Sequence, residues 1–168
     1  ITIGGIPNGT HYTVTEADYK QEGFITAPAG AEGDIVTGVT AETTFTNTHE
    51  VGGLTVKKAT NGNGVDTQKE FRFTVTLEHD TLPLNNNYGV QFAEVATENG
   101  YKAEATFTLK SGESQALTGI PAGTSYTVTE KSYVAEGYVT KVATNNDNGT
   151  IAEGGNAEVE FTNTRNVG

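Results

Sequence analysis

The sequence repeats itself over a distance that matches the length of a whole domain. Residues 5–16 read GIPNGTHYTVTE and residues 119–130 read GIPAGTSYTVTE, an offset of 114 positions (119 − 5). A second matching segment, FTNT, occupies residues 45–48 and 161–164, an offset of 116 positions (161 − 45). This period is too long for a solenoid repeat and suits one small domain per repeat. The chain therefore holds parts of two tandem copies of one domain, with two residues inserted in the later copy.

The two copies are expected to differ in completeness. Residues 51–168 contain a complete copy, whose first predicted strand begins near Gly53. Residues 1–50 contain only the pattern of the second half of the preceding copy, so we expect an incomplete domain without its opening strands. About fifty residues of such a sheet cannot close a core alone. Three outcomes follow for this half-domain: it is unstable, it is completed by a partner, or it packs on its neighbour.

Alternating apolar and polar residues predict β-strands in the complete copy. Two stretches place apolar residues at a spacing of two: Phe71, Phe73, Val75 and Leu77, then Ala103, Ala105, Phe107 and Leu109. Such alternation is typical of a strand with one buried face. Glycine- and asparagine-rich turns separate the strands, and we expect turns at residues 119–123 and 145–149. The sequence therefore predicts an all-β fold, an antiparallel β-sandwich of the immunoglobulin-like or prealbumin-like kind.

Composition excludes several kinds of partner and stabilisation. A net charge of −11 over 168 residues would repel phosphates, so we expect no nucleic-acid partner. No apolar run is long enough to cross a bilayer, so we expect no membrane insertion in this segment. The chain has no cysteine, and a disulfide therefore cannot stabilise it.

Residue patterns typical of enzymes and metal sites are missing from the sequence as well. The three histidines are scattered and show neither metal-ligand nor catalytic-triad spacing. The oxygen-rich run at residues 145–149 lacks the bidentate glutamate of a calcium loop and is more typical of a turn. We therefore predict that the chain is not an enzyme, binds no metal and needs no cofactor.

Three polar residues fall on the predicted buried faces. Lys58 follows Leu54 and Val56 at a spacing of two, and Glu130 and Asn163 continue the buried faces of two later strands in the same way. A buried amine, carboxyl and carboxamide are unfavourable unless they satisfy one another. We therefore expect these three side chains to meet. They could form a hydrogen-bonded triad that never reacts, or a covalent bond between the amine and the carboxamide.

Three motifs carry a resemblance to a known family. They are LTVKK at residues 54–58, YTVTE at 126–130 and FTNT at 161–164. Together they resemble the collagen-adhesin B-type (Cna-B-like) domain, which is repeated in Gram-positive pilins and surface adhesins. The resemblance covers essentially all of residues 53–168 and the second half of the pattern in residues 1–50.

The resemblance implies a spontaneous isopeptide bond between Lys58 and Asn163, with Glu130 as the proton-transfer residue. Burial disfavours the charged forms of an amine and a carboxyl, and a neutral amine can attack the carboxamide carbon. Lys57 is the rival nucleophile, but its opposite parity along the strand predicts that it faces solvent.

The earlier copy keeps only part of this set. Glu16 and Asn47 stand in the places that match the glutamate and the asparagine of the later copy. The matching lysine would lie before residue 1, so we expect an incomplete site in residues 1–50.

The resemblance also implies a function outside the cell. The chain would be a structural stalk or pilus-shaft repeat on the cell wall or pilus surface. Its partners would be neighbouring repeats or subunits of the same protein. The alternative is a ligand-binding adhesin module that recognises a host protein or glycan through surface loops such as residues 79–100. A third reading is a noncovalent polymer in which chains exchange strands.

Overall fold

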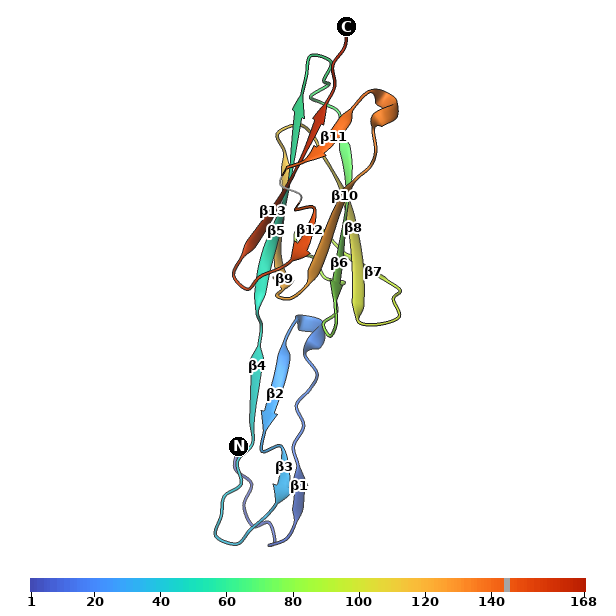
Figure 1. The fold of residues 1–168 in the computed structure, drawn as a ribbon. Helices are drawn as coiled ribbons and strands as arrows, with labels where there is room; N and C mark the ends of the chain where they lie inside the picture. The colour runs from blue at the N-terminus through green and yellow to red at the C-terminus, as the bar shows by residue number, and fades with distance from the viewer. Residues whose placement is uncertain (144–145) are drawn as a thin grey trace. The chain divides into compact units, whose positions relative to one another are not determined.

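The computed structural model of the chain describes residues 1–143 and 146–168 (Figure 1). It divides into two compact units, Ile1–His49 and Glu50–Gly168. The described secondary structure is almost wholly β-strand in both units. None of the described helices combines the length and the apolar character that are needed to cross a membrane.

The second unit is a sandwich of two β-sheets. One sheet has the strand order β11-β13-β5-β9 and the other has the order β12-β10-β6-β8-β7. The strands of the first sheet are β5 (Val51–Asn61), β9 (Ser114–Pro121), β11 (Val139–Val142) and β13 (Asn156–Thr164). Those of the second sheet are β6 (Phe71–His79), β7 (Ala93–Val95), β8 (Tyr101–Leu109), β10 (Ser125–Glu130) and β12 (Asn148–Thr150). The described strand pairs are antiparallel except β5–β13, so the predicted all-β antiparallel sandwich is confirmed, with one parallel pair added.

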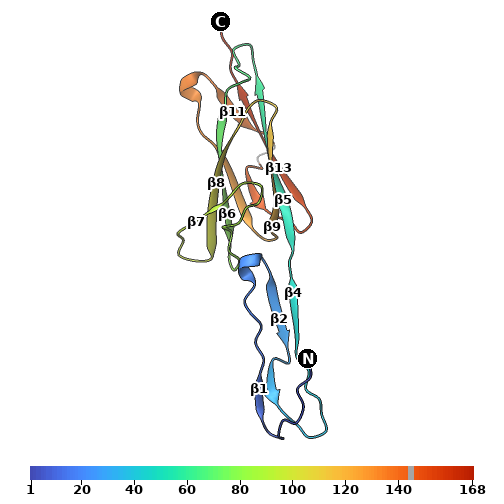
Figure 2. The ribbon, with the colours of Figure 1, turned by 180° about the vertical axis from the view of Figure 1, so that it is seen from behind.

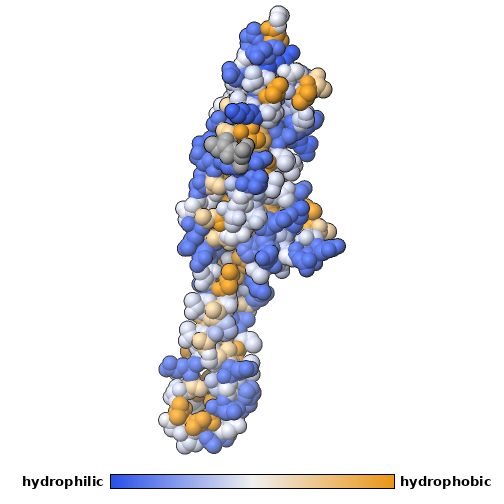
Figure 3. Space-filling model, in the orientation of Figure 1, coloured by the Kyte–Doolittle hydropathy of each residue, from blue (hydrophilic) through white to orange (hydrophobic). Residues whose placement is uncertain are grey.

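The core of the second unit lies between its two sheets. Both stretches with clear alternation are strands, β6 and β8, and each buries its apolar face. The fully buried residues include Phe71, Phe73, Val75 and Leu77 from β6 and, from the facing sheet, Leu54, Val56, Leu117 and Val159. Hydrophilic residues cover much of the surface that Figure 3 shows. The apolar side chains between the sheets are removed from water, and this burial stabilises the packing of one sheet on the other.

The first and last strands of this unit are direct neighbours. β5 and β13 run parallel, side by side in the front and back views (Figures 1 and 2). Lys58 lies opposite Phe161, and Thr60 lies opposite Asn163. Parallel strands cannot be joined by a hairpin, and here the rest of the unit forms the connection between them.

The first unit repeats strand pairs of the second. β1 (His11–Thr13) pairs with β3 (Glu32–Asp34), and β2 (Ile25–Ala29) pairs with β4 (Thr44–Thr48). These pairs correspond to β10–β12 and β11–β13. The shared register is seen in the facing residues Tyr12–Gly33 and Tyr126–Gly149, and in Thr26–Asn47 and Thr140–Asn163. The sequence repeat is therefore also a repeat of strand register.

The turn predicted at residues 119–123 is wrong for most of its length. β9 continues through this segment as far as Pro121, and the chain turns only at Ala122 and Gly123. Gly119 has a φ of 75° and lies where the register between β5 and β9 shifts. It therefore forms a bulge that bends the strand without ending it.

The turn predicted at residues 145–149 is also corrected, because Asn148–Thr150 form strand β12. Gly149 lies directly against the ring of Tyr126, where an added Cβ would be 2.8 Å from the phenol oxygen. Glycine lets this short strand approach β10 closely, and its polar neighbours conceal the strand in the sequence pattern. Asn145 of the predicted turn lies outside the described residues.

Candidate functional site

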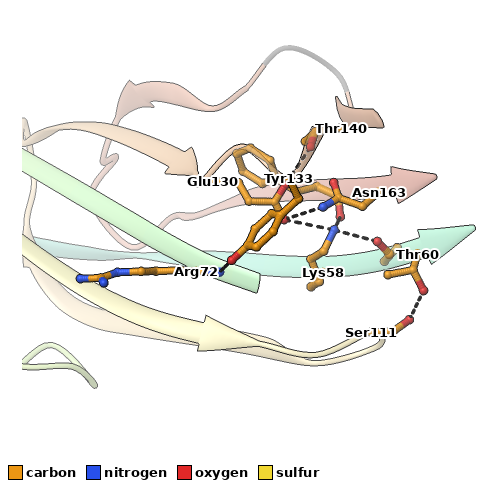
Figure 4. A network of polar contacts seen from close by, with 10 residues as sticks. Lys58, Thr60, Arg72, Ser111, Glu130, Tyr133, Thr140 and Asn163 are labelled. Atoms are coloured by element: carbon orange, nitrogen blue, oxygen red, sulfur yellow. Dashed lines mark hydrogen bonds and ion pairs between the residues drawn. The ribbon is translucent and has the colours of Figure 1, made fainter. Parts of the chain in front are cut away.

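Three strands of the second unit bring Lys58, Glu130 and Asn163 together. Lys58 lies in β5 and Asn163 in β13 of one sheet, whereas Glu130 is the last residue of β10 in the other sheet. The alternation of side chains along each strand turns all three toward the interior. Figure 4 shows their polar ends pointing toward one another.

The Glu130 carboxylate is the centre of this cluster. Its Oε1 lies 3.3 Å from Lys58 Nζ and accepts a hydrogen bond from Asn163 Nδ2 at 3.1 Å. The side chains of Lys58 and Glu130 are 0% and 1% exposed, and Asn163 is fully buried. Water therefore screens this ion pair far less than it screens a pair on a protein surface.

The Lys58 amine has three further contacts. It donates hydrogen bonds to the carbonyl oxygens of Ala59 at 2.9 Å and Phe161 at 3.2 Å, and it lies 4.3 Å from the centroid of the Phe71 ring. Burial lowers the pKa of Lys58 below its usual value of 10.5 because the charged amine loses hydration, although Glu130 opposes this shift. The neutral, nucleophilic amine is therefore easier to form here than in an exposed lysine.

The carboxamide of Asn163 is only partly satisfied. Its Nδ2 donates to Glu130, but its buried Oδ1 has no hydrogen-bond partner among the described residues. An unpaired buried carbonyl oxygen is unfavourable and is available to a donor. Glu130 already contacts this carboxamide, so a proton taken up by Glu130 could be donated to the carboxamide oxygen.

Lys57 faces the opposite side of β5, as its parity predicts. Its Nζ forms an ion pair with Glu158 Oε2 at 2.8 Å, and its side chain is 39% exposed. Lys57 is therefore separate from the buried cluster and offers a matched control for Lys58.

The first unit contains the corresponding acid and amide. Asn47 Nδ2 donates to Glu16 Oε1 at 3.3 Å. Both residues are exposed, in contrast to the buried side chains of Glu130 and Asn163. The first unit thus retains the hydrogen bond between acid and amide without the burial that lowers a lysine pKa.

Thr140 contacts the site, although the sequence pattern did not single it out. Its Oγ1 donates to Glu130 Oε2 at 3.0 Å, and it lies opposite Asn163 in the β11–β13 pair. Thr26 holds the matching place in the first unit, opposite Asn47. A comparison of the two copies could have identified these threonines from the sequence, because each stands ten residues after the glutamate of its copy.

An aromatic cluster covers the ring that contacts Lys58. Tyr133 and Tyr138 pack edge-on against Phe71, with ring centroids 5.2 and 5.4 Å away. All three aromatic residues are buried. Their rings therefore form a second layer that separates the Lys58 amine from solvent.

The two tyrosines belong to a motif that also occurs twice. They flank the short 3-10 helix η2 (Val134–Glu136) in the segment YVAEGY, residues 133–138. The first copy has YKQEGF at residues 19–24, with the short 3-10 helix η1 (Lys20–Glu22) at the same place. Comparison of the two copies could have identified this motif from the sequence.

The cluster contains the groups that are needed to form an amide bond. An amine with a lowered pKa, a carboxyl and a carboxamide are in contact in a buried setting. The contacts of Glu130 with the amine of Lys58 and with the carboxamide of Asn163 suit a reaction between the protein's own side chains.

The chain is similar to pilus proteins of Streptococcus pyogenes. It is 34% identical over 128 residues to a pilin of serotype M1, which covers 71% of this chain and 38% of that protein. It is 38% identical over 78 residues to the pilus tip adhesin Cpa, which covers 46% of this chain and 11% of that protein. The crystal structure of the major pilin aligns with a TM-score of 0.52 and 28% identity, over 81% of this chain and 55% of that chain. The chain thus spans less than two thirds of each of these relatives.

A protein-family model matches nearly the whole chain. The matched residues are 1–49 and 52–165, so both units are included. The chain belongs to the family described as "Domain of unknown function (DUF7601)".

Proposed function

We propose that the second unit is a load-bearing repeat of a pilus shaft or adhesin stalk, stabilised by a self-formed amide bond between Lys58 and Asn163. The observation that carries this proposal is the burial of both side chains around one carboxylate, Glu130. Each of the three groups would be costly to bury alone. Their joint burial in contact favours a reactive role over an accidental cluster.

The bond can form without an external reagent. Lys58 passes a proton to Glu130 within their ion pair, which leaves a neutral amine and a carboxylic acid. The amine nitrogen attacks Cγ of Asn163 while Glu130 donates its proton to the carboxamide oxygen Oδ1. Glu130 then moves a proton from the attacking nitrogen to Nδ2. The Cγ–Nδ2 bond breaks, ammonia leaves, and the oxygen returns its proton to Glu130 as the carbonyl forms again. The close contact of these groups replaces an enzyme.

The position of the bond suits a protein under tension. Lys58 and Asn163 lie on neighbouring first and last strands of the unit. Tension that enters at the start of β5 and leaves at the end of β13 would cross the bond, so the residues between them would carry no load. On the loop-closure model, a cross-link between residues 105 positions apart (163 − 58) stabilises the fold by about 4–5 kcal/mol. It would replace the disulfides that a chain without cysteine cannot form.

The named relatives support a structural role in a pilus. They are a pilin and a pilus tip adhesin. We propose accordingly that this chain is a non-enzymatic part of a protein displayed outside a Gram-positive cell. Its partners are neighbouring repeats or subunits of the same protein. The ligand-binding alternative through residues 79–100 has no comparable support.

We also propose that the two units are tandem Cna-B-like repeats, with residues 1–50 forming the second half of one repeat. The shared register of β2–β4 with β11–β13 and of β1–β3 with β10–β12 supports this proposal. Glu16 and Asn47 would then be site residues that require a lysine-bearing strand beside β4.

Intact-mass spectrometry of the whole chain tests the proposed bond. We expect a mass lower than that of the sequence by one ammonia, and a peptide map that joins Lys58 to Asn163. Lys58→Ala and Asn163→Ala should each abolish the loss, whereas Lys57→Ala should retain it. A chain with the unaltered mass of its sequence would overturn the proposed reaction.

A further inference from the structure

Glu130 is held from two sides. Its Oε1 contacts the amine of Lys58 and the amide of Asn163, and its Oε2 accepts the hydroxyl proton of Thr140 at 3.0 Å. The proposed bond formation uses the first set of contacts and leaves the second without a role. The Thr140 contact is also visible in Figure 4, where it approaches Glu130 from β11.

We propose that Thr140 is a positioning residue for the cross-linking reaction, an inference that rests on the function proposed above. A proton-transfer group must stay within hydrogen-bond reach of both atoms that it serves. The terminal torsion of a glutamate side chain is broad, so its carboxyl plane is free to turn unless a contact fixes it. The hydroxyl bond to Oε2 restricts that turn and keeps Oε1 directed at Lys58 and Asn163.

The backbone places Thr140 for this role. Thr140 lies directly opposite Asn163 in the antiparallel β11–β13 pair, and facing residues of such a pair project to the same side of the sheet. Its hydroxyl therefore lies on the same side as the reacting carboxamide. Position 140 is exposed, so packing of the core does not require a threonine there.

The first unit shows the corresponding hydroxyl in a second arrangement. Thr26 Oγ1 donates to Asn47 Oδ1 at 2.6 Å and lies 3.5 Å from Glu16 Oε2. A threonine at this place can therefore reach the carboxyl or the carboxamide oxygen. In the second unit, the matching Oδ1 of Asn163 is buried without a partner among the described residues. In the second unit the Thr140 hydroxyl donates to the carboxyl of Glu130 instead, so there the threonine holds the proton-transfer group.

A timed measurement tests this role. The full chain would be made by cell-free synthesis and quenched in denaturant at intervals, and its intact mass would follow the loss of ammonia. Thr140→Val should slow that loss by about 10- to 100-fold, as expected when a hydrogen bond that orients a reacting group is lost. Thr140→Ser keeps the hydroxyl and should react at close to the wild-type rate. Thr129→Val, exposed on the opposite face of β10 beside Glu130, is the matched control and should not change the rate.

Folding is separated from reaction by combining each variant with Lys58→Ala and measuring its unfolding midpoint in urea. The positioning role is supported if the variants unfold at equal urea concentrations, while Thr140→Val loses ammonia slowly and Thr140→Ser loses it at close to the wild-type rate. If Thr140→Val unfolds in that background, Thr140→Ala replaces it in the comparison with Thr140→Ser. Equal rates with and without the hydroxyl overturn the role of Thr140 but leave the cross-link intact. A wild-type chain that never loses ammonia overturns the proposed function together with this inference.

Discussion

Lys58 and Asn163 are diagonal neighbours across the parallel β5–β13 pair. Lys58 lies opposite Phe161, and Asn163 lies opposite Thr60, two positions further along β5. Residues two apart on a strand share a face, so both side chains point into the core. The Glu130 carboxylate reaches both from the facing sheet. Side-chain contacts therefore connect the first and last strands in addition to their backbone hydrogen bonds.

Glu130→Gln should abolish the loss of ammonia, because an amide cannot take up and release the proton in the same way. It also leaves the buried charge of Lys58 without its partner, which should lower the free energy of unfolding by about 3–5 kcal/mol relative to the unlinked Asn163→Ala chain. Intact mass and urea unfolding measure the two effects. The control is Glu136→Gln, which removes a partly exposed ion pair with Lys69 and should cost about 0–1 kcal/mol. Loss of ammonia from the Glu130→Gln chain would exclude Glu130 as the proton-transfer group.

Lys58→Met tests the contribution of the bond to stability. Methionine keeps an unbranched, adaptable side chain in the core but cannot form the amide. We expect the free energy of unfolding to fall by about 4–5 kcal/mol relative to the linked chain. Denaturant unfolding measures the difference, with Lys57→Met as the exposed control. If Lys58→Met were as stable as Lys57→Met, the loop-closure estimate would be wrong for this domain.

The rate of bond formation should depend on pH through Lys58. Burial lowers its pKa below 10.5, while Glu130 and Glu160 oppose the shift. The proposed reaction uses the one proton that Lys58 and Glu130 share, so the rate should stay level while the pair holds this proton and fall as the pH rises through the lowered pKa of Lys58. Timed mass measurements on newly synthesised chain, repeated over a pH series, would show this fall below pH 10.5. A rate that stayed level up to the usual lysine value would contradict desolvation of the amine.

The same lowered pKa predicts the pH dependence of stability in the unlinked Asn163→Ala chain. The folded state binds the Lys58 proton less tightly than the unfolded state does. Between the folded-state pKa and 10.5, the unfolded chain therefore holds more protons, and the free energy of unfolding rises with pH. Below the folded-state pKa, this contribution to the slope vanishes. Urea titrations across the window measure the sign, and a stability that fell with pH there would contradict the prediction.

Tyr133 tests the aromatic cover of the site. Its hydroxyl accepts the backbone N–H of Arg72 at 2.9 Å, so Tyr133→Phe should cost about 1–3 kcal/mol of stability while the amide bond still forms. Tyr133→Ala also removes the ring beside Phe71, and it should slow bond formation because water reaches the amine. Val134→Ala is the control, since Val134 is 69% exposed. Urea unfolding and timed mass measurements separate the two effects. Wild-type kinetics in Tyr133→Ala would show that the ring does not exclude water from the reaction.

Side-chain parity made much of the site predictable from the sequence. The alternation around Lys58 and Glu130 is local, so each could be assigned to a buried face before any contact was known. The strands β6 and β8 were predicted for the same reason, since their apolar faces are strictly alternating. The internal repeat indicated the size of the domain and the strand that carries Asn163.

Other features depend on information that alternation does not carry. The parallel pairing of β5 with β13 joins distant segments and is set by the topology of the whole unit. Gly119 was assigned to a turn because a bulge and a turn use the same glycine chemistry. Thr140 lies in β11, whose four residues are exposed or half-buried and show no apolar alternation. Its contact with Glu130 could be found only once the strands had been placed.

The strand pairs also locate the two residues that lengthen the second copy. Thr26 in β2 and Thr140 in β11 are 114 positions apart, whereas Gly33 in β3 and Gly149 in β12 are 116 positions apart. The added residues therefore lie between β11 and β12, outside the pairs whose register the copies share. Chain length changes at this point while the registers of the flanking pairs stay the same. We therefore expect a peptide epitope or a labelling sequence inserted between β11 and β12 to leave the register of both flanking pairs unchanged.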